Sequence, residues 1–103
     1  MGELGADSYY VAIRVAGPAW EATRPMREQE RWDDHAAFMD ALAAEGWIVA
    51  GGPLGDGRRA LHITAAASAR EVEERLTADP WTKLGVLRLE SVEPWQILLR
   101  GGQ

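Results

Sequence analysis

The strongest constraint on the fold is a predicted hairpin in the middle of the chain. Residues 47–54, "WIVAGGPL", are apolar without alternation, whereas residues 58–66, "RRALHITAA", alternate. One side of the second segment carries Leu61, Ile63 and Ala65, and the other carries Ala60, His62 and Thr64. Residues 55–57, "GDG", lie between the segments and are typical of a turn that joins antiparallel strands. The middle of the chain is therefore expected to supply two adjacent antiparallel strands.

Two helical patterns flank this hairpin. The first begins in the charged stretch that opens at Met26, and it is expected to end at Gly46. At about 100° per residue, the inward side of this helix carries Trp32, His35, Ala36, Met39, Leu42 and Ala43. The second pattern begins with a capping box, Ser68 followed by Glu71, and Pro80 ends its regular part. The hairpin is thus enclosed by two helices.

Strand patterns are found near both ends of the chain. Residues 9–15, "YYVAIRV", alternate, and residues 86–99 form an extended pair of segments interrupted at Pro94. The order strand, helix, strand, strand, helix, strand is that of a ferredoxin-like α+β sandwich. Two helices cover only one face of such a sheet, yet the strands are apolar on both sides. A second subunit is expected to cover the other face.

The overall composition excludes several classes of protein. The chain has 103 residues, enough for a single domain over residues 1–103, with flexible ends expected at 1–7 and 100–103. The net charge is −5 and the 11 basic residues form no run, which argues against nucleic acid as a partner. No apolar run approaches the ~20 residues of a membrane span. A cytoplasmic protein without membrane contact is expected.

His35 stands out because it is a polar residue on the inward side of a helix. An unpaired buried polar group costs ~1–3 kcal/mol, so this imidazole needs a hydrogen-bond partner. One interpretation is a core histidine bonded to a backbone carbonyl. The other is a histidine held by a carboxylate, whose far nitrogen can serve as a general base near neutral pH.

Asp79 has a local structural role that the sequence predicts. An aspartate directly before Pro80 is typical of a helix N-cap followed by proline at the first helical position. A capping carboxylate has a second oxygen, which remains available to another partner. Asp33 and Asp34 project away from His35, so no metal site is expected there.

Several other residues have both a structural and a ligand-binding interpretation. Aromatic residues dominate cores and interfaces, but they also form flat pocket walls; this applies to Trp32, Trp81 and Trp95. Gly52 and Pro53 can simply end a strand, or they can let the backbone approach a ligand. His62 faces the dimer cleft or water if Leu61 and Ile63 pack under the helices, with a place in the binding site as the alternative.

Three motifs in this order resemble the YCII-related family of dimeric α+β barrels, over about Tyr9 to Leu99. They are "HAAFMDALAAEGWIVAGGPL" (35–54), "ADPW" (78–81) and "VEPW" (92–95). The resemblance implies a homodimer with its sheets face to face, and an active site built on a histidine–aspartate pair, here His35 and Asp79. The family's usual arginine three residues before that histidine is here Trp32, which favours a flatter, apolar or aromatic ligand.

These observations lead to one hypothesis and one alternative. The hypothesis is a cofactor-independent isomerase or lyase that abstracts a proton from a small ring compound, with His35 as base and Asp79 as its orienter. The residues expected to bind the substrate are Trp32, Gly52, Pro53, His62 and Trp81. The alternative is a non-catalytic dimer that binds a small ligand in the same cleft or serves as a structural module. Neither requires a metal or a cofactor.

Overall fold

The computed structural model of the chain describes residues 8–102 and has eight secondary-structure elements. In chain order these are β1 (Tyr9–Ala16), the 3₁₀ turn η1 (Met26–Glu28), α1 (Trp32–Ala44), β2 (Ile48–Leu54), β3 (Arg59–Ala65), α2 (Ala69–Thr77), α3 (Pro80–Leu84) and β4 (Leu87–Trp95). Flexible ends were predicted at 1–7 and 100–103; of these residues, 1–7 and 103 lie outside the described part of the chain.

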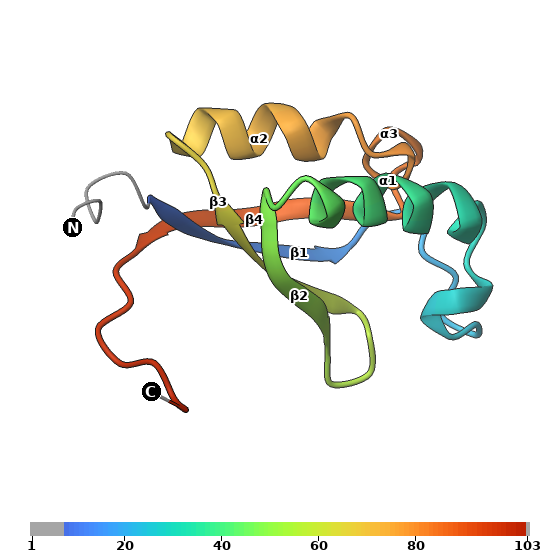
Figure 1. Cartoon of the computed structure of the whole chain (residues 1–103). Coiled ribbons are helices and arrows are strands. Elements are labelled where there is room, and N and C mark those ends of the chain that lie inside the picture. Colours follow the sequence, from blue (N-terminus) through green and yellow to red (C-terminus); the bar gives the residue numbers. More distant parts are fainter. Residues whose placement is uncertain (1–7, 103) are drawn as a thin grey trace.

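The four strands form one antiparallel sheet in the order β2-β3-β1-β4. Figure 1 shows α1, α2 and α3 lying on one side of this sheet, while no helix of residues 8–102 lies on its other face. The neighbours of β1 in the sheet, β3 and β4, are distant from it in the chain, and the helices in the intervening segments form one layer on the same side. The predicted ferredoxin-like α+β fold is confirmed.

The hairpin and the second helix form as the sequence predicts. Gly55 and Gly57 adopt positive φ angles of 56° and 92° in the turn between β2 and β3, a conformation that glycine reaches without a steric penalty. At the start of α2, the hydroxyl of Ser68 accepts a hydrogen bond of 3.1 Å from the backbone N–H of Glu71.

The first helix begins six residues later than predicted. Met26–Glu28 is a separate 3₁₀ turn, and α1 starts only at Trp32, after Arg31 at a positive φ of 60°. Gln29 explains the interruption. Its backbone is extended, and its buried side chain hydrogen-bonds the backbone of Glu21 and of Arg24. These bonds hold the preceding loop and prevent a continuous helix.

The predicted interruption of the last strand at Pro94 is wrong. β4 runs through Pro94, which pairs with Tyr10 of β1, and residues 96–100 are not a strand. Because β4 is an edge strand, the missing N–H of Pro94 can face the unpaired side without loss of a ladder hydrogen bond.

The two faces of the sheet differ in what covers them. The side chains that β1 and β3 bury toward the helices are Ala12, Arg14, Ala60, His62 and Thr64. Leu61 and Ile63 lie on the opposite, open face and are half-buried. The condition under which His62 would face a dimer cleft or water is therefore not met, since the alternation in β3 places His62 under the helices.

Candidate functional site

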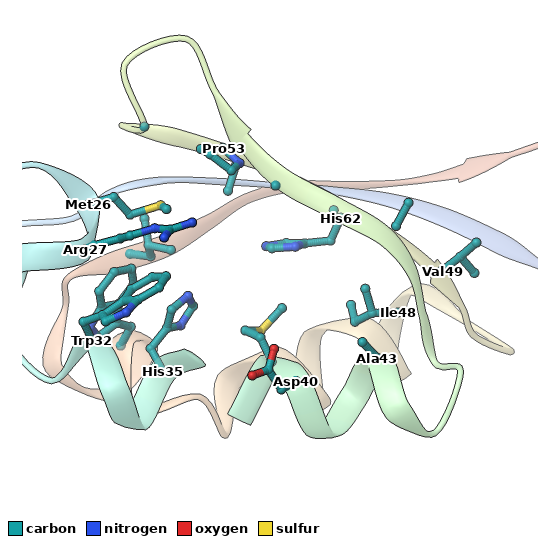
Figure 2. Close-up of a pocket in the computed structure, with 18 residues that line it drawn as sticks. Met26, Arg27, Trp32, His35, Asp40, Ala43, Ile48, Val49, Pro53 and His62 are labelled. Atoms are coloured by element: carbon teal, nitrogen blue, oxygen red, sulfur yellow. The ribbon is translucent and has the colours of Figure 1, made fainter. Parts of the chain in front are cut away.

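A pocket of about 330 Å³ lies between α1 and the strands β2 and β3. Six of the seven residues expected at the site line it, namely Trp32, His35, Gly52, Pro53, His62 and Trp81. Figure 2 shows His35 and Trp32 projecting from α1 and His62 from β3 into the same space. Asp79 lies behind His35 and does not line the pocket. Trp95, at the end of β4, is 40% exposed and does not line it either.

The two oxygens of Asp79 have separate roles. Oδ1 accepts a hydrogen bond of 2.9 Å from the backbone N–H of Trp81, so Asp79 caps α3 as the sequence predicts. Oδ2 lies 2.7 Å from Nδ1 of His35. A carboxylate only accepts hydrogen bonds, so Nδ1 of His35 is the donor and, in the neutral ring, Nε2 carries the free lone pair. A backbone capping motif thus positions a side-chain acceptor for a histidine on another helix.

Arg14 is a further member of this group that the sequence analysis did not single out. Its Nη2 lies 2.9 Å from Oδ2 of Asp79 and donates a hydrogen bond of 2.7 Å to the hydroxyl of Thr82. The side chains of Arg14 and Asp79 are both fully buried. The available signal was an arginine at a position that alternates with apolar residues in a strand, since a buried charge requires a partner.

The charges of this buried group stabilise one another. Burial alone would raise the pKa of Asp79, but the hydrogen bond from His35, the charge of Arg14 and the N–H of Trp81 outweigh it and hold this pKa below its usual value. Burial lowers the pKa of Arg14, and the neighbouring Asp79 opposes that effect. Asp79 is therefore an anion at neutral pH, paired with a cation on one side and an imidazole on the other.

Aromatic rings surround the imidazole of His35. The indole of Trp81 stacks on it, with ring centroids 3.9 Å apart and planes inclined by 7°. Trp32 lies 5.6 Å from both rings. Trp81 is fixed in turn, because its indole N–H donates a hydrogen bond of 2.6 Å to the carbonyl of Glu30. The walls beside the predicted base are thus flat, apolar and rigidly supported.

The pocket also contains polar residues outside this group. Arg27, on η1, lies with its guanidinium 5.8 Å from the ring centre of Trp32 and lines the pocket. His62 is only 6% exposed. Burial above all, together with the electrostatic influence of Arg14 and His35, lowers its pKa to about 3, although Asp79 acts in the opposite direction. His62 is therefore a neutral imidazole at physiological pH.

Residues 8–102 contain neither a cluster of metal ligands nor a membrane-spanning helix. Over that range no group of three histidine, aspartate or glutamate side chains is placed so that it could hold a metal ion. None of the helices described there is long and apolar enough to cross a membrane.

Comparisons with known proteins agree with the fold. No curated protein sequence matches the chain. Among solved structures, 5-chloro-2-hydroxyhydroquinone dehydrochlorinase (TftG) from Burkholderia phenoliruptrix AC1100, in complex with 2,5-dihydroxybenzoquinone, is similar to it. The two are 30% identical, the match covers 84% of this chain and 93% of that chain, and the TM-score is 0.58. The model of the YCII-related domain matches residues 9–96, and the chain therefore belongs to the YCII-related family.

Proposed function

We propose that the chain is a cofactor-independent enzyme of isomerase or lyase type, in which His35 abstracts a proton from a small ring compound. The observation that carries this proposal is the hydrogen bond of 2.7 Å between Nδ1 of His35 and Oδ2 of Asp79. It leaves Nε2 of the neutral ring as a base, and His35 lines an apolar pocket.

The proposed reaction accounts for each proton and electron pair that moves. Nε2 of His35 takes a proton from a carbon or oxygen of the substrate, and the carboxylate of Asp79 stabilises the imidazolium that forms. In an elimination, the electron pair left behind forms a double bond while a leaving group departs with its own pair. In an isomerisation, His35 returns the proton to a different atom. Neither route needs an oxidant or a reductant.

Arg14 and Trp81 act as positioning residues in this proposal. The backbone N–H of Trp81 and the guanidinium of Arg14 each contact Asp79, so the carboxylate is fixed before any substrate arrives. A base that is already oriented loses little freedom when it reacts, which is an established source of catalytic rate. The stacked indole of Trp81 restricts the imidazole further.

The shape of the pocket favours a flat substrate. Its volume of about 330 Å³ lies at the small end of ligand pockets, and planar rings line it, namely Trp32 and the imidazole of His35 that is stacked on Trp81. The similar dehydrochlorinase is named for 5-chloro-2-hydroxyhydroquinone, and its structure holds 2,5-dihydroxybenzoquinone. We therefore infer that this chain takes a single ring with oxygen substituents.

The catalytic proposal is tested by chloride release from 5-chloro-2-hydroxyhydroquinone, measured with wild-type protein and with His35→Gln. Loss of a general base lowers kcat by about 10²- to 10⁴-fold, and we expect a loss in this range. Asp34→Asn is the matched control, because Asp34 precedes His35 in α1 but forms an exposed ion pair with Arg31. Equal turnover in His35→Gln would show that His35 is not the base. Ring compounds that bind without turning over would favour the non-catalytic alternative.

We also propose that the active protein is a homodimer. Half-buried apolar side chains lie on the sheet face without helices, including Val11, Ile13, Leu61 and Ile63. Antiparallel sheets that face water are normally polar on that side, so a second copy is the proposed cover. Light scattering should give twice the mass of one chain, and Ile13→Lys should give a monomer. A wild-type monomer at micromolar concentration contradicts this.

A further inference from the structure

His62 is a buried polar residue whose role is not explained by the packing around it. It comes from the middle of β3, where it pairs with Ala12 of β1 and Gly51 of β2. Within the described residues, its Nε2 is buried and has no hydrogen-bond partner. Buried side-chain nitrogens are nearly always paired, so an unpaired one at a pocket wall indicates a partner that the chain itself does not supply.

The space around His62 is shaped by a glycine. A Cβ atom at Gly51 would lie 3.1 Å from Nδ1 of His62 and 3.0 Å from the backbone oxygen of Leu61. Any larger residue at position 51 would therefore press on the imidazole or on the sheet. Glycine on β2 leaves the ring of His62 free to project into the pocket, as Figure 2 shows.

The surroundings of His62 determine what kind of group it can bind. Arg14, His35 and Asp79 are the charged or titratable groups that act on it, and its burial opposes a positive charge. A neutral imidazole has one N–H donor and one acceptor nitrogen, and it suits a hydroxyl or carbonyl group better than a carboxylate or a phosphate. His62 thus differs in charge from the guanidinium of Arg27 at the same pocket.

The positions of the two histidines define the geometry of a ligand. His35 comes from α1 and His62 from β3, so their imidazoles enter the pocket from two different walls (Figure 2). A flat ring beside Trp32 and Trp81 would have one edge toward each histidine. One substituent cannot contact both histidines. A ring that contacts both must therefore carry two substituents.

We propose that His62 is a specificity-determining residue, whose imidazole hydrogen-bonds an oxygen on the ring edge remote from His35, so that the pocket selects rings oxygenated at two separated positions. This inference rests on the proposed function, because it takes the ring compound beside His35 as given. It adds to the proposed function a second residue that recognises the ligand, and it specifies that the ligand carries two separated oxygen substituents.

The test compares hydroquinone with phenol, which differ by one hydroxyl group. Binding is followed through the fluorescence of the tryptophans, two of which line the pocket. Wild-type protein should bind hydroquinone about tenfold more tightly than phenol, the effect of one hydrogen bond. His62→Leu should reduce this ratio to about one, and His62→Gln, whose amide can still donate and accept, should retain part of it. An unchanged ratio in His62→Leu overturns the inference.

Two further measurements keep the inference testable if His62→Leu does not fold. Catechol has the same atoms as hydroquinone but adjacent hydroxyl groups, and wild-type protein should bind it more weakly than hydroquinone. The ring nitrogen resonances of His62 should also shift when hydroquinone is added to wild-type protein. Equal affinity for the two isomers, or resonances of His62 that do not move, contradicts the inference.

These binding results are independent of turnover. Suppose that no chloride is released, but the ratio of the affinities for hydroquinone and phenol falls to about one in His62→Leu. The catalytic proposal is then wrong, and the recognition role of His62 stands. If chloride release depends on His35 while His62→Leu leaves the ratio unchanged, the role of His62 is wrong and the catalytic proposal stands.

Discussion

The imidazole of His35 lies parallel to the indole of Trp81, with ring centroids 3.9 Å apart. The same tryptophan donates its backbone N–H to Oδ1 of Asp79, whose Oδ2 holds His35. Trp81 therefore supports the histidine from its face and orients the histidine's partner at the same time. The sequence Asp-Pro-Trp at 79–81 links a helix cap, a stacked ring and a buried carboxylate in three consecutive residues.

The first prediction separates the two contacts of Trp81. In Trp81→Phe an aromatic ring remains beside His35, but the carbonyl of Glu30 loses its donor, so the free energy of unfolding should fall by ~1–3 kcal/mol. In Trp81→Ala the ring is lost from a fully buried site, and the loss should reach ~3–5 kcal/mol. Urea denaturation measures both. Equal losses would show that the indole hydrogen bond, not the ring, carries the stability.

A second prediction concerns the buried ion pair of Arg14 and Asp79. Asp79→Asn leaves a buried guanidinium without its counter-charge, which typically costs ~3–5 kcal/mol of unfolding free energy. Arg14→Met leaves His35 as the remaining side-chain partner of Oδ2 of Asp79. The double variant should therefore lose less stability than the sum of the single losses. Strict additivity in the urea denaturation of all three variants would contradict a direct coupling between the two charges.

The third prediction is an acid sensitivity caused by His62. Its pKa is about 3 in the folded chain and ~6.5 when unfolded. Between these values the unfolded chain binds a proton that the folded chain does not, so folding stability falls as the pH drops from 6.5 toward 3.

The measurement is the free energy of unfolding at pH 7 and pH 5, in wild-type protein and in His62→Gln. A single group of this kind contributes up to about 2 kcal/mol of loss over that interval. Between pH 7 and pH 5, the free energy of unfolding of His62→Gln should fall by less than that of wild-type protein, and the difference should be roughly this amount. Asp79 does not confound the comparison: its stabilisation is complete above the unfolded pKa of ~3.9 and is lost only as the pH falls through its lower folded value. Identical losses would mean that His62 is protonated in the folded chain.

His35 and Asp79 could be predicted because each obeys a local rule. Helical periodicity turns His35 inward, and an aspartate before a proline predicts an N-cap. The resemblance to the YCII-related family was needed to suggest that the two residues act together, since they are 44 positions apart.

The role of Arg14 and the face on which His62 lies were not predicted from the sequence. Alternation divides a strand into two faces, but in β3 the helices cover the face with His62 and Thr64, although the opposite face with Leu61 and Ile63 is the more apolar one. The pattern therefore does not reveal which face the helices cover. The late start of α1 has a similar cause, because it depends on hydrogen bonds from the side chain of Gln29 to a distant loop.

The last prediction tests how closely the loop after β1 packs on the end of α3. Gly17 donates its N–H to the carbonyl of Val86 at 2.8 Å, and a Cβ atom on Gly17 would lie only 2.3 Å from the backbone oxygen of Gly85. Gly85 is the left-handed C-cap of α3, with φ of 81°, so it cannot move without disturbing the helix that Asp79 caps.

Gly17→Ala should therefore lower the free energy of unfolding by ~1–3 kcal/mol or more, as overpacking against a backbone atom does. Gly52→Ala is the control for stability, because a Cβ atom there meets no atom within 4 Å, and its stability should stay within about 0.5 kcal/mol of wild type. Thermal and urea denaturation of both variants give the comparison. If Gly17→Ala is as stable as Gly52→Ala, the loop after β1 packs less closely on the end of α3 than the structure indicates. That contact then does not help to fix α3, the helix that Asp79 caps.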